Sequence, residues 1–325
     1  MNFPIITPDQ LAVICPSKNQ PEKVKRLLEC FVQSNVKPAQ IIIADGGENL
    51  RSIVGSFTKL LNCTHLDCPE AGQILQRNFA HKHLLSSIKI VIHLDDDITF
   101  GKDALNRMID FWNNPVNHRG RPLAGASFNL IDIPKLRNSP IRKLFFLNTE
   151  PKGLISSAGY AAPFCPASQT HDVDWLLGGA TAWSREVIDL YKHPMSFPTR
   201  WAVCEDLMYS YPLRNSYRMA VVHDAIMLHN ETYSTMSSNK GIFYGASSVI
   251  MRYHFVQQNQ NFSTLAFFWM SLGILAGHLA RGVIGSKRHL GLFSGGVKGL
   301  IEVLFNHLMQ RDSKSLALKL VSWKF

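Results

Sequence analysis

Short apolar runs alternate with segments of helical periodicity over about the first hundred residues. The apolar runs are Leu11–Pro16, Gln40–Asp45, Cys63–Asp67 and Ile88–Leu94. Helical spacing follows Pro21 in the apolar residues Val24, Leu27, Leu28, Phe31 and Val32, and further helices are predicted at Asn49–Leu61 and Gln73–Leu85. Apolar strands that alternate with amphipathic helices predict an α/β fold, Rossmann-like, with a mostly parallel sheet flanked by helices.

Unusual residues lie at the carboxyl ends of three of the predicted strands. They are Pro16-Ser17-Lys18, Asp45-Gly46-Gly47 and Asp95-Asp96-Asp97. Ligands of parallel α/β sheets bind at the carboxyl ends of the strands, so a site is expected at this edge. Later in the chain, Asp174–Ala182 is predicted to form a strand and a Gly-Gly turn, and Met219–Leu228 is a further predicted strand. A long loop-like insertion covers Asn113–Thr170.

The three consecutive aspartates are the sharpest local motif. Neighbouring carboxylates repel each other unless a cation or water offsets their charge. In extended backbone, Asp95 and Asp97 point to the same side, so both can bind one hard cation such as Mg²⁺ or Mn²⁺. A solvated loop before the next helix is the alternative interpretation. The position directly after the strongest predicted strand favours the metal site.

A second acidic pair, Glu205-Asp206, begins a helical stretch. A carboxylate that faces an acceptor hydroxyl can take its proton as the hydroxyl attacks. An acidic first turn that complements the helix dipole explains the same residues. The residue pattern alone leaves both interpretations open.

Candidate ligand-binding residues surround the predicted helix at Gln73–Leu85. Gly72 can let backbone approach a ligand closely, and Arg77 can pair with a phosphate, although a solvated arginine is the alternative. Asp45 can accept a hydrogen bond from a base or ribose, or it can cap a turn.

Two histidines and one aromatic segment add further candidates. Of His223 and His229, which flank a predicted strand, His229 is the stronger candidate for a metal ligand. Trp175 with Gly178-Gly179 can form an acceptor surface, because an aromatic face stacks on sugars and glycines admit close approach. Core packing and a plain turn are the alternatives.

The character of the chain changes after about Gly245. Leu265–Gly277 is an unbroken apolar run of 13 residues, whereas a spanning helix needs about 20. A helical apolar stripe and a basic tail follow. We therefore expect a catalytic domain over residues 1–245 and a helical, amphipathic, membrane-associating segment over 246–325 that lies on the membrane. A spanning helix and a buried helix of a soluble protein are the alternatives.

The charge balance points to an anionic partner. The chain has 34 Lys and Arg residues against 24 acidic ones, a net charge of +10. Basic residues gather toward the tail, and no basic patch interleaved with aromatic residues is visible in the catalytic region, so nucleic acid is not expected. None of the six cysteines forms a C-x-x-C pair, and no secretory signal is visible, which favours reduced thiols in the cytoplasm.

Taken in order, these motifs resemble family 2 glycosyltransferases with the GT-A fold. The order is Pro16-Ser17, Asp45, Gly72 with Arg77-Asn78, Leu94–Asp97, Trp175–Ala180 and Glu205-Asp206. The resemblance covers roughly residues 10–235. Each motif is loose by itself, whereas the ordered set is specific.

The resemblance implies a role for each matching residue. The implied donor- or nucleotide-binding residues are Pro16, Ser17, Asp45, Gly72, Arg77, Asn78, Asp95 and Asp96. The implied ligands of Mn²⁺ or Mg²⁺ are Asp95, Asp97 and His229. The implied catalytic pair is Glu205 and Asp206, with Asp206 as the base. Trp175, Gly178 and Gly179 are expected on the acceptor side.

The implied activity is an inverting sugar transfer from a UDP-, GDP- or dTDP-linked donor to an acceptor hydroxyl. The acceptor would be a glycan or a lipid-linked glycan, in cell-surface polysaccharide or glycolipid synthesis. The expected location is the cytoplasmic face of the inner membrane, peripheral or anchored. The segment Cys15–Asn19 departs from the family, which often has a hydroxyl residue after proline followed by Tyr or Arg.

Two other classes of protein are alternatives. A sugar nucleotidyltransferase also uses paired carboxylates and a metal, but it usually needs a glycine-rich phosphate loop near the first strand, and Cys15–Gln20 has no glycine. A non-catalytic, membrane-associated glycan-binding or scaffold module would have no need for Asp95, Asp97 and Asp206. Both considerations favour the glycosyltransferase.

Overall fold

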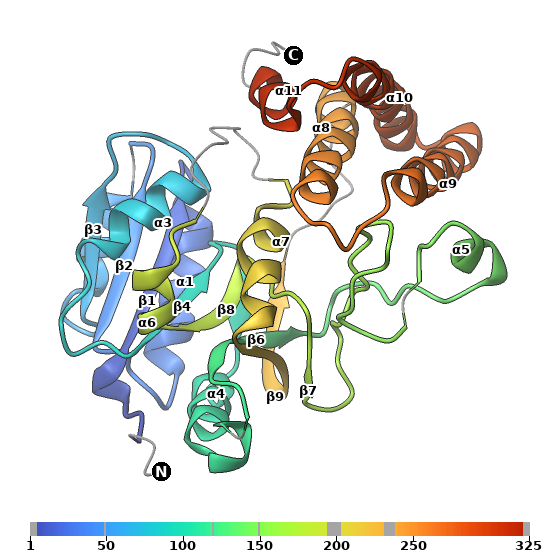
Figure 1. The fold of residues 1–325 in the computed structure, drawn as a ribbon. Coiled ribbons are helices and arrows are strands. Elements are labelled where there is room, and N and C mark those ends of the chain that lie inside the picture. Colours follow the sequence, from blue (N-terminus) through green and yellow to red (C-terminus); the bar gives the residue numbers. More distant parts are fainter. Residues whose placement is uncertain are drawn as a thin grey trace. The chain divides into compact units, whose positions relative to one another are not determined.

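The computed structural model describes residues 5–48, 50–118, 120–148, 150–193, 203–230 and 238–320 (Figure 1). The chain divides into two compact units that interleave along the sequence. The first unit contains Met1–Lys135, Phe164–Met195 and Tyr209–Glu231, and the second contains Leu136–Pro163, Ser196–Met208 and Thr232–Phe325. These bounds divide the chain into compact units and do not test the predicted functional domains. A catalytic domain over residues 1–245 stays a prediction.

One mixed sheet forms the centre of the first unit, with strand order β3-β2-β1-β4-β8-β6-β9-β5 and β7 paired to β9. The strands are β1 Leu11–Ser17, β2 Gln40–Asp45, β3 Cys63–Asp67, β4 Ile90–Leu94, β5 Ile98–Phe100, β6 Leu123–Leu130, β7 His171–Asp172, β8 Ala180–Ser184 and β9 Arg218–His229. Strands β1 to β4 pair in parallel, as their alternation with helices predicts. Because β8 runs antiparallel to both β4 and β6, the sheet as a whole is mixed.

Helices flank this sheet. They are α1 Pro21–Gln33, α2 Arg51–Phe57, α3 Gln73–His81, α4 Ala104–Asn113 and α6 Arg185–Leu190, with short 3₁₀ helices at Pro8–Gln10, Pro115–His118 and Tyr211–Asn215. Helix α1 starts at Pro21 as predicted, and four of the five residues of its apolar stripe are buried. Helices α2 and α3 end earlier than their periodicity suggested.

Two predictions about strands need correction. Within Asp174–Ala182 the predicted Gly-Gly turn forms at Gly178-Gly179, but the strand starts only after it, at Ala180. A hydrogen bond of 2.6 Å from Thr181 Oγ1 to the Leu177 carbonyl spans this turn. The insertion that was expected as long loops contains β6, in which all eight residues are buried. Strand propensity does not indicate β6, because the strand is rich in small residues. One of them is Gly125, where a Cβ would lie 2.8 Å from the Trp183 ring.

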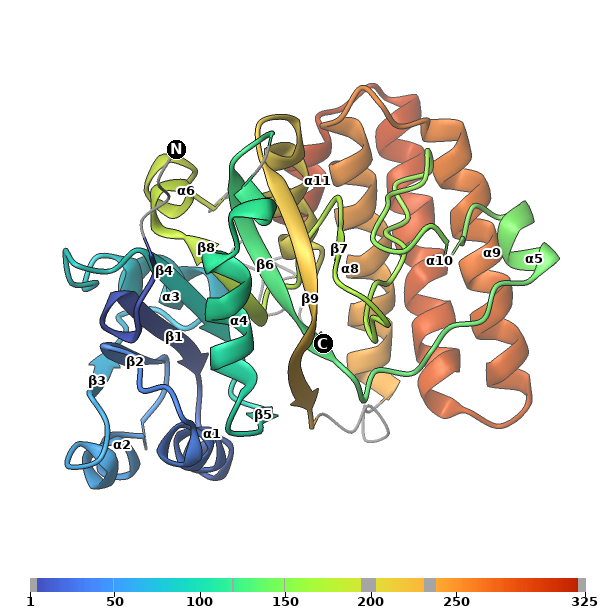
Figure 2. The same cartoon turned by 90° about the horizontal axis from the view of Figure 1, so that it is seen from below.

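Helices form most of the second unit, which confirms the predicted C-terminal helical region. They are α5 Pro140–Leu144, α8 Ser238–Gln257, α9 Thr264–Val283, α10 Lys287–Leu308 and α11 Ser313–Lys319. A short helix, α7 Glu205–Ser210, begins in the second unit and ends in the first. Figure 2 shows α8, α10 and α9 side by side.

Glycines let α8 and α10 approach each other backbone to backbone. A Cβ on Gly295 would lie 1.8 Å from the Ile242 carbonyl oxygen, and one on Gly245 would lie 2.3 Å from the Leu292 carbonyl oxygen. Backbone atoms of a helix cannot move aside as a flexible side chain can. The close packing of these two helices therefore requires glycine at both positions.

We expect Gly295→Val to lower the free energy of unfolding by about 3 kcal/mol, because overpacked interiors cost roughly 1–3 kcal/mol and occasionally more. The change is measured by urea denaturation of the full chain. Gly277→Val is the matched control, since Gly277 lies in α9 with nothing within 4 Å of a Cβ. Equal midpoints for the two variants would contradict the close approach of α8 and α10.

Candidate active site

The carboxyl ends of β1 to β4 bring polar residues to one edge of the sheet, as the sequence predicts. Ser17 of β1 is in register with Asp45 of β2, and Asp45 is in register with Asp67 of β3. Pro16 lies inside β1 and is buried next to Ala44. The three aspartates follow β4 directly.

Asp95 is held from two sides. Its Oδ1 accepts hydrogen bonds from Gln73 Nε2 at 2.6 Å and from Arg77 Nη2 at 2.8 Å, both on α3. Its backbone N–H donates to the Gly179 carbonyl at 2.9 Å. Arg77 is only 4% exposed, so its buried charge is offset by this carboxylate. Sequence reasoning missed Gln73, which lies one turn before Arg77 on the same helix.

Gly179 leaves room for the Asp95 carboxylate. A Cβ at this position would lie 2.0 Å from Asp95 Oδ2. We therefore expect Gly179→Ala to displace the carboxylate and to lower kcat/KM by about 100-fold, the cost of misplacing a catalytic group by roughly 1 Å. Gly101→Ala is the control, because nothing lies within 4 Å of a Cβ at that position. Unchanged steady-state kinetics in Gly179→Ala would show that the position of Asp95 does not matter.

Asp96 interacts with side chains of β1 and α1. Its Oδ2 accepts a hydrogen bond of 2.5 Å from Ser17 Oγ, and its Oδ1 lies 3.8 Å from Lys23 Nζ. Burial raises the pKa of Asp96 to about 6, and the interactions with Ser17 and Lys23 oppose this rise. Asp96 therefore ties the end of β1 and helix α1 to the loop after β4.

Asp97 and His229 meet although 132 positions separate them in the sequence. His229 ends β9 and pairs with Ile98 of β5, which places its Nε2 3.5 Å from Asp97 Oδ1. Asp97 Oδ1 is buried and accepts no hydrogen bond from the described residues. Lys23 Nζ lies 3.3 Å from the other oxygen, Oδ2, so an ammonium group offsets part of the charge. The sequence analysis did not identify Lys23. This residue lies on the polar face of α1, next to this edge of the sheet.

The predicted metal ligands are brought together. The ligand atoms of Asp95, Asp97 and His229 all lie within 4.8 Å of one another. Two carboxylates and an imidazole suit Mn²⁺, and a buried carboxylate oxygen without a hydrogen-bond donor fits a cation. These residues can therefore hold a divalent metal. His223, by contrast, is exposed on β9 and takes no part in this group.

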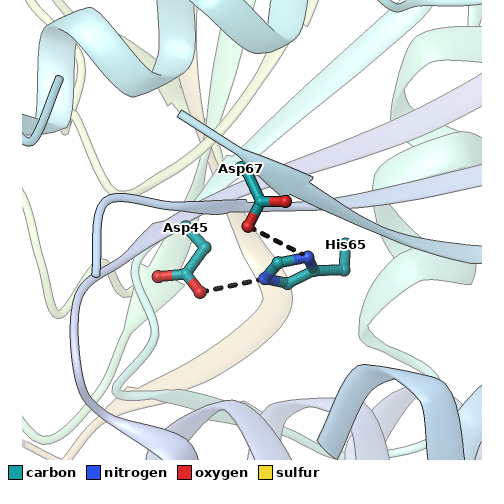
Figure 3. Close-up of side chains that lie close together, drawn as sticks. All are labelled: Asp45, His65 and Asp67. Carbon is teal, nitrogen blue, oxygen red and sulfur yellow. Dashed lines mark hydrogen bonds and ion pairs between the residues drawn. The ribbon is translucent and has the colours of Figure 1, made fainter. Parts of the chain in front are cut away.

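A second group with the same ligand types lies at the ends of β2 and β3. Figure 3 shows His65 between Asp45 and Asp67. His65 Nε2 lies 2.9 Å from Asp45 Oδ2, and Nδ1 lies 3.6 Å from Asp67 Oδ1. Asp45 is 2% exposed, and its Oδ1 accepts a hydrogen bond of 2.8 Å from the Gly47 N–H. His65 and Gly47 therefore orient the predicted base-binding carboxylate.

A buried glutamine joins the strand ends to α3. Gln76 Nε2 donates to the carbonyls of Ser17 at 2.8 Å and Ala44 at 2.6 Å, and its Oε1 accepts from the Gly72 N–H. Gly72 has φ of 152°, which explains why glycine precedes the helix. The neighbouring Asn78 has a buried Nδ2 that makes no hydrogen bond to the described residues.

The second acidic pair lies in the second unit, at the start of α7. Glu205 is buried, and Asp206 Oδ1 accepts a hydrogen bond of 2.9 Å from the Leu207 N–H. Burial and the charge of Glu205 raise the pKa of Asp206 to about 7, while Arg252 of α8 opposes this rise. A carboxyl group that titrates near neutral pH is suited to accept a proton. Its role as base stays a prediction.

The predicted acceptor-side residues occupy different environments. Trp175 is 8% exposed and packs edge-on against Phe164, with ring centroids 4.9 Å apart, which favours the core-packing interpretation. Gly178 and Gly179 form the turn before β8, next to Asp95. An acceptor role for these three residues stays a prediction.

Comparison with known proteins gives one sequence family and several structures. Residues 12–148 match the family model described as Glycosyl transferase family 2. The mannosyltransferase PcManGT from Pyrobaculum calidifontis, in complex with GDP-Man and Mn²⁺, aligns with a TM-score of 0.52 at 15% identity, over 97% of this chain and 88% of that one. TarS of S. aureus aligns with a TM-score of 0.51 at 13% identity. None of the curated proteins matches this chain in sequence.

The family match over residues 12–148 and the similarity to solved structures together indicate a glycosyltransferase with the GT-A fold. Residues 12–148 match the family 2 glycosyltransferase model, which confirms the resemblance seen in the motifs of that part of the chain. The structural similarities lie below 25% identity and show the fold. The alignment with TarS covers 82% of this chain but only 43% of the length of that protein.

Proposed function

We propose that this chain transfers a sugar from a nucleotide-sugar donor to an acceptor hydroxyl, with inversion and with Mn²⁺ or Mg²⁺ as cofactor. The convergence of Asp95, Asp97 and His229 within 4.8 Å carries this proposal. A divalent cation bound there would offset the charge of the leaving nucleoside diphosphate. The complex of PcManGT with GDP-Man and Mn²⁺ supports a donor and a cofactor of these classes.

Other residues of the chain bind the nucleotide, position Asp95 and accept the proton. Asp45, oriented by His65, accepts a hydrogen bond from the nucleotide, and Arg77 and Gln73 keep Asp95 in its position. Asp206 takes the proton of the attacking hydroxyl, which its pKa of about 7 suits. Attack and departure on opposite faces of the anomeric carbon invert its configuration in one displacement.

We also propose that the second unit lies on a membrane surface, in line with a glycan or lipid-linked acceptor in cell-surface polysaccharide or glycolipid synthesis. Within the described residues, α9 is the one helix long and apolar enough to cross a membrane, by length and composition only. Large apolar side chains are exposed on two neighbouring helices: Leu265, Trp269 and Leu272 on α9, and Ile301, Phe305 and Leu308 on α10. An exposed apolar surface of this kind is typical of interfacial helices.

The proposal is tested by incubating the full chain with UDP-, GDP- and dTDP-linked sugars in the presence of Mn²⁺ or Mg²⁺. Released nucleoside diphosphate is the readout, and a chelator removes the metal in a parallel reaction. We expect release from one donor that stops with the chelator and returns with added metal. Absence of both release and metal-dependent binding for every donor would contradict the proposal and favour a non-catalytic membrane module.

A further inference from the structure

A cavity of about 210 Å³ lies among α8, α9 and α10 of the second unit. Most of its wall is apolar, with Val249, Phe267, Met270, Ile274 and Leu292 among the lining residues. Each helix also contributes one nitrogen-rich side chain: Arg252, His278 and Arg288. Among the described residues, no carboxylate lines the cavity. An apolar space with two guanidinium groups and no acidic side chain is suited to an anion that carries an apolar part.

Two nitrogen atoms of this cavity, one on Arg252 and one on His278, have unused hydrogen-bonding capacity. Arg252 Nε and His278 Nδ1 are buried and make no hydrogen bond with the described residues. Burial, followed by the charges of His289, Arg281 and Arg288, lowers the pKa of His278 to about 4, so the guanidinium groups supply the charge at neutral pH. The charges of Asp206 and Arg252 interact, and the pKa of Asp206 of about 7 leaves that carboxyl group only partly ionised.

An apolar groove of about 400 Å³ runs between α9 and α10 and shares Leu275 with the cavity. Leu272, Ala276, Val297, Ile301 and Leu304 line it, and no polar side chain of the described residues does. Ile301 is 63% exposed, so the groove opens to the surface. The surrounding segment, residues 238–320, has nine Lys and Arg residues but only two acidic ones, Glu302 and Asp312.

We propose that the cavity and the groove together bind one lipid with a phosphate-bearing headgroup. The phosphate lies against Arg252 and Arg288, which present planar donors matched to its oxygens, and the hydrocarbon tail lies in the groove between α9 and α10. Binding needs no nucleotide sugar, so it is measured without a donor and its outcome is independent of sugar transfer. A membrane phospholipid and a phosphate-linked lipid acceptor share this chemistry.

The experiment is a calorimetric titration of the full chain with short-chain phosphatidic acid below its micelle concentration. The same titration is run with the matching phosphatidylcholine and with inorganic phosphate. We expect phosphatidic acid to bind more tightly than either. Arg288→Gln is expected to weaken it about tenfold, the value of one charge-assisted hydrogen bond. Lys298→Gln is the matched control, since Lys298 is an exposed residue of α10 outside the cavity.

A second variant tests the groove without changing any charge. Ala276 is exposed and lines the groove, so Ala276→Trp fills the groove while the helix stays intact. We expect this variant to weaken phosphatidic acid but not inorganic phosphate. Competition with farnesyl phosphate then separates the two sources: displacement at lower concentration identifies a prenyl-type lipid, and weaker displacement identifies a diacyl phospholipid.

Three results would overturn the proposal. Equal binding of phosphatidylcholine would show that the cavity does not recognise the phosphate charge. Equal weakening by Arg288→Gln and Lys298→Gln would show diffuse attraction to a basic surface. Equal binding of inorganic phosphate, unaffected by Ala276→Trp, would show a simple anion site without a place for the lipid tail.

Discussion

Asp97→Asn lowers sugar transfer by about 10²–10³-fold, the usual effect of removing one group that stabilises transition-state charge. Asparagine keeps the shape of the side chain but removes the charge from Oδ1, the buried oxygen that lies 3.5 Å from His229 Nε2. Affinity for Mn²⁺ falls together with kcat, because one of the two ligand carboxylates loses its charge. Steady-state kinetics over a range of Mn²⁺ concentrations measure both effects.

Asp103→Asn is the matched control for this variant. Asp103 lies six positions further on and accepts a hydrogen bond of 2.7 Å from Asn35 Nδ2 at an exposed site. The control should transfer sugar at the rate of the unmodified chain. Removal of metal with a chelator should abolish transfer in both the unmodified chain and the control. Full activity of Asp97→Asn, or activity that survives the chelator, would exclude the proposed metal site.

Asp206→Asn is expected to lower kcat by about 10²–10⁴-fold, the usual contribution of general base catalysis, with little change in affinity for the donor. In the unmodified chain, kcat/KM should rise with pH through about 7, because only the ionised Asp206 accepts a proton. Glu205→Gln should move this rise to lower pH, since the charge of Glu205 raises the pKa of Asp206. A flat pH profile would exclude Asp206 as the base.

Asp206→Asn is also expected to be more stable than the unmodified chain at neutral and higher pH. The carboxyl group of Asp206 titrates near its usual 3.8 in the unfolded chain and at about 7 in the folded one. Between these values the folded state binds more protons, so the free energy of unfolding falls as pH rises. Asparagine removes this loss. Thermal unfolding at pH 5 and pH 8 checks the sign, and a Tm below that of the unmodified chain at pH 8 would contradict it.

Local sequence was sufficient for strands β1 to β4 of the first unit and for the start of α1, but not for the short strand β5. Strands β1, β2 and β3 and the start of α1 at Pro21 follow from apolar runs, helical spacing and the fixed φ of proline. Strand β6 was not predicted, because its eight buried residues include glycine, alanines and a serine in place of β-branched residues. Gly125 of this strand lies close against the Trp183 ring, a tertiary contact that strand propensity does not describe.

The sequence by itself determined which residues could bind a metal or accept a proton, because those properties belong to the side-chain types and to their order along the chain. The tertiary structure decided which of them meet. His229 reaches Asp97 only through the pairing of β9 with β5, and His65 reaches Asp45 only through the register of β3 against β2. Pairing of distant strands depends on the burial of whole faces rather than on local preference, so no local pattern shows it.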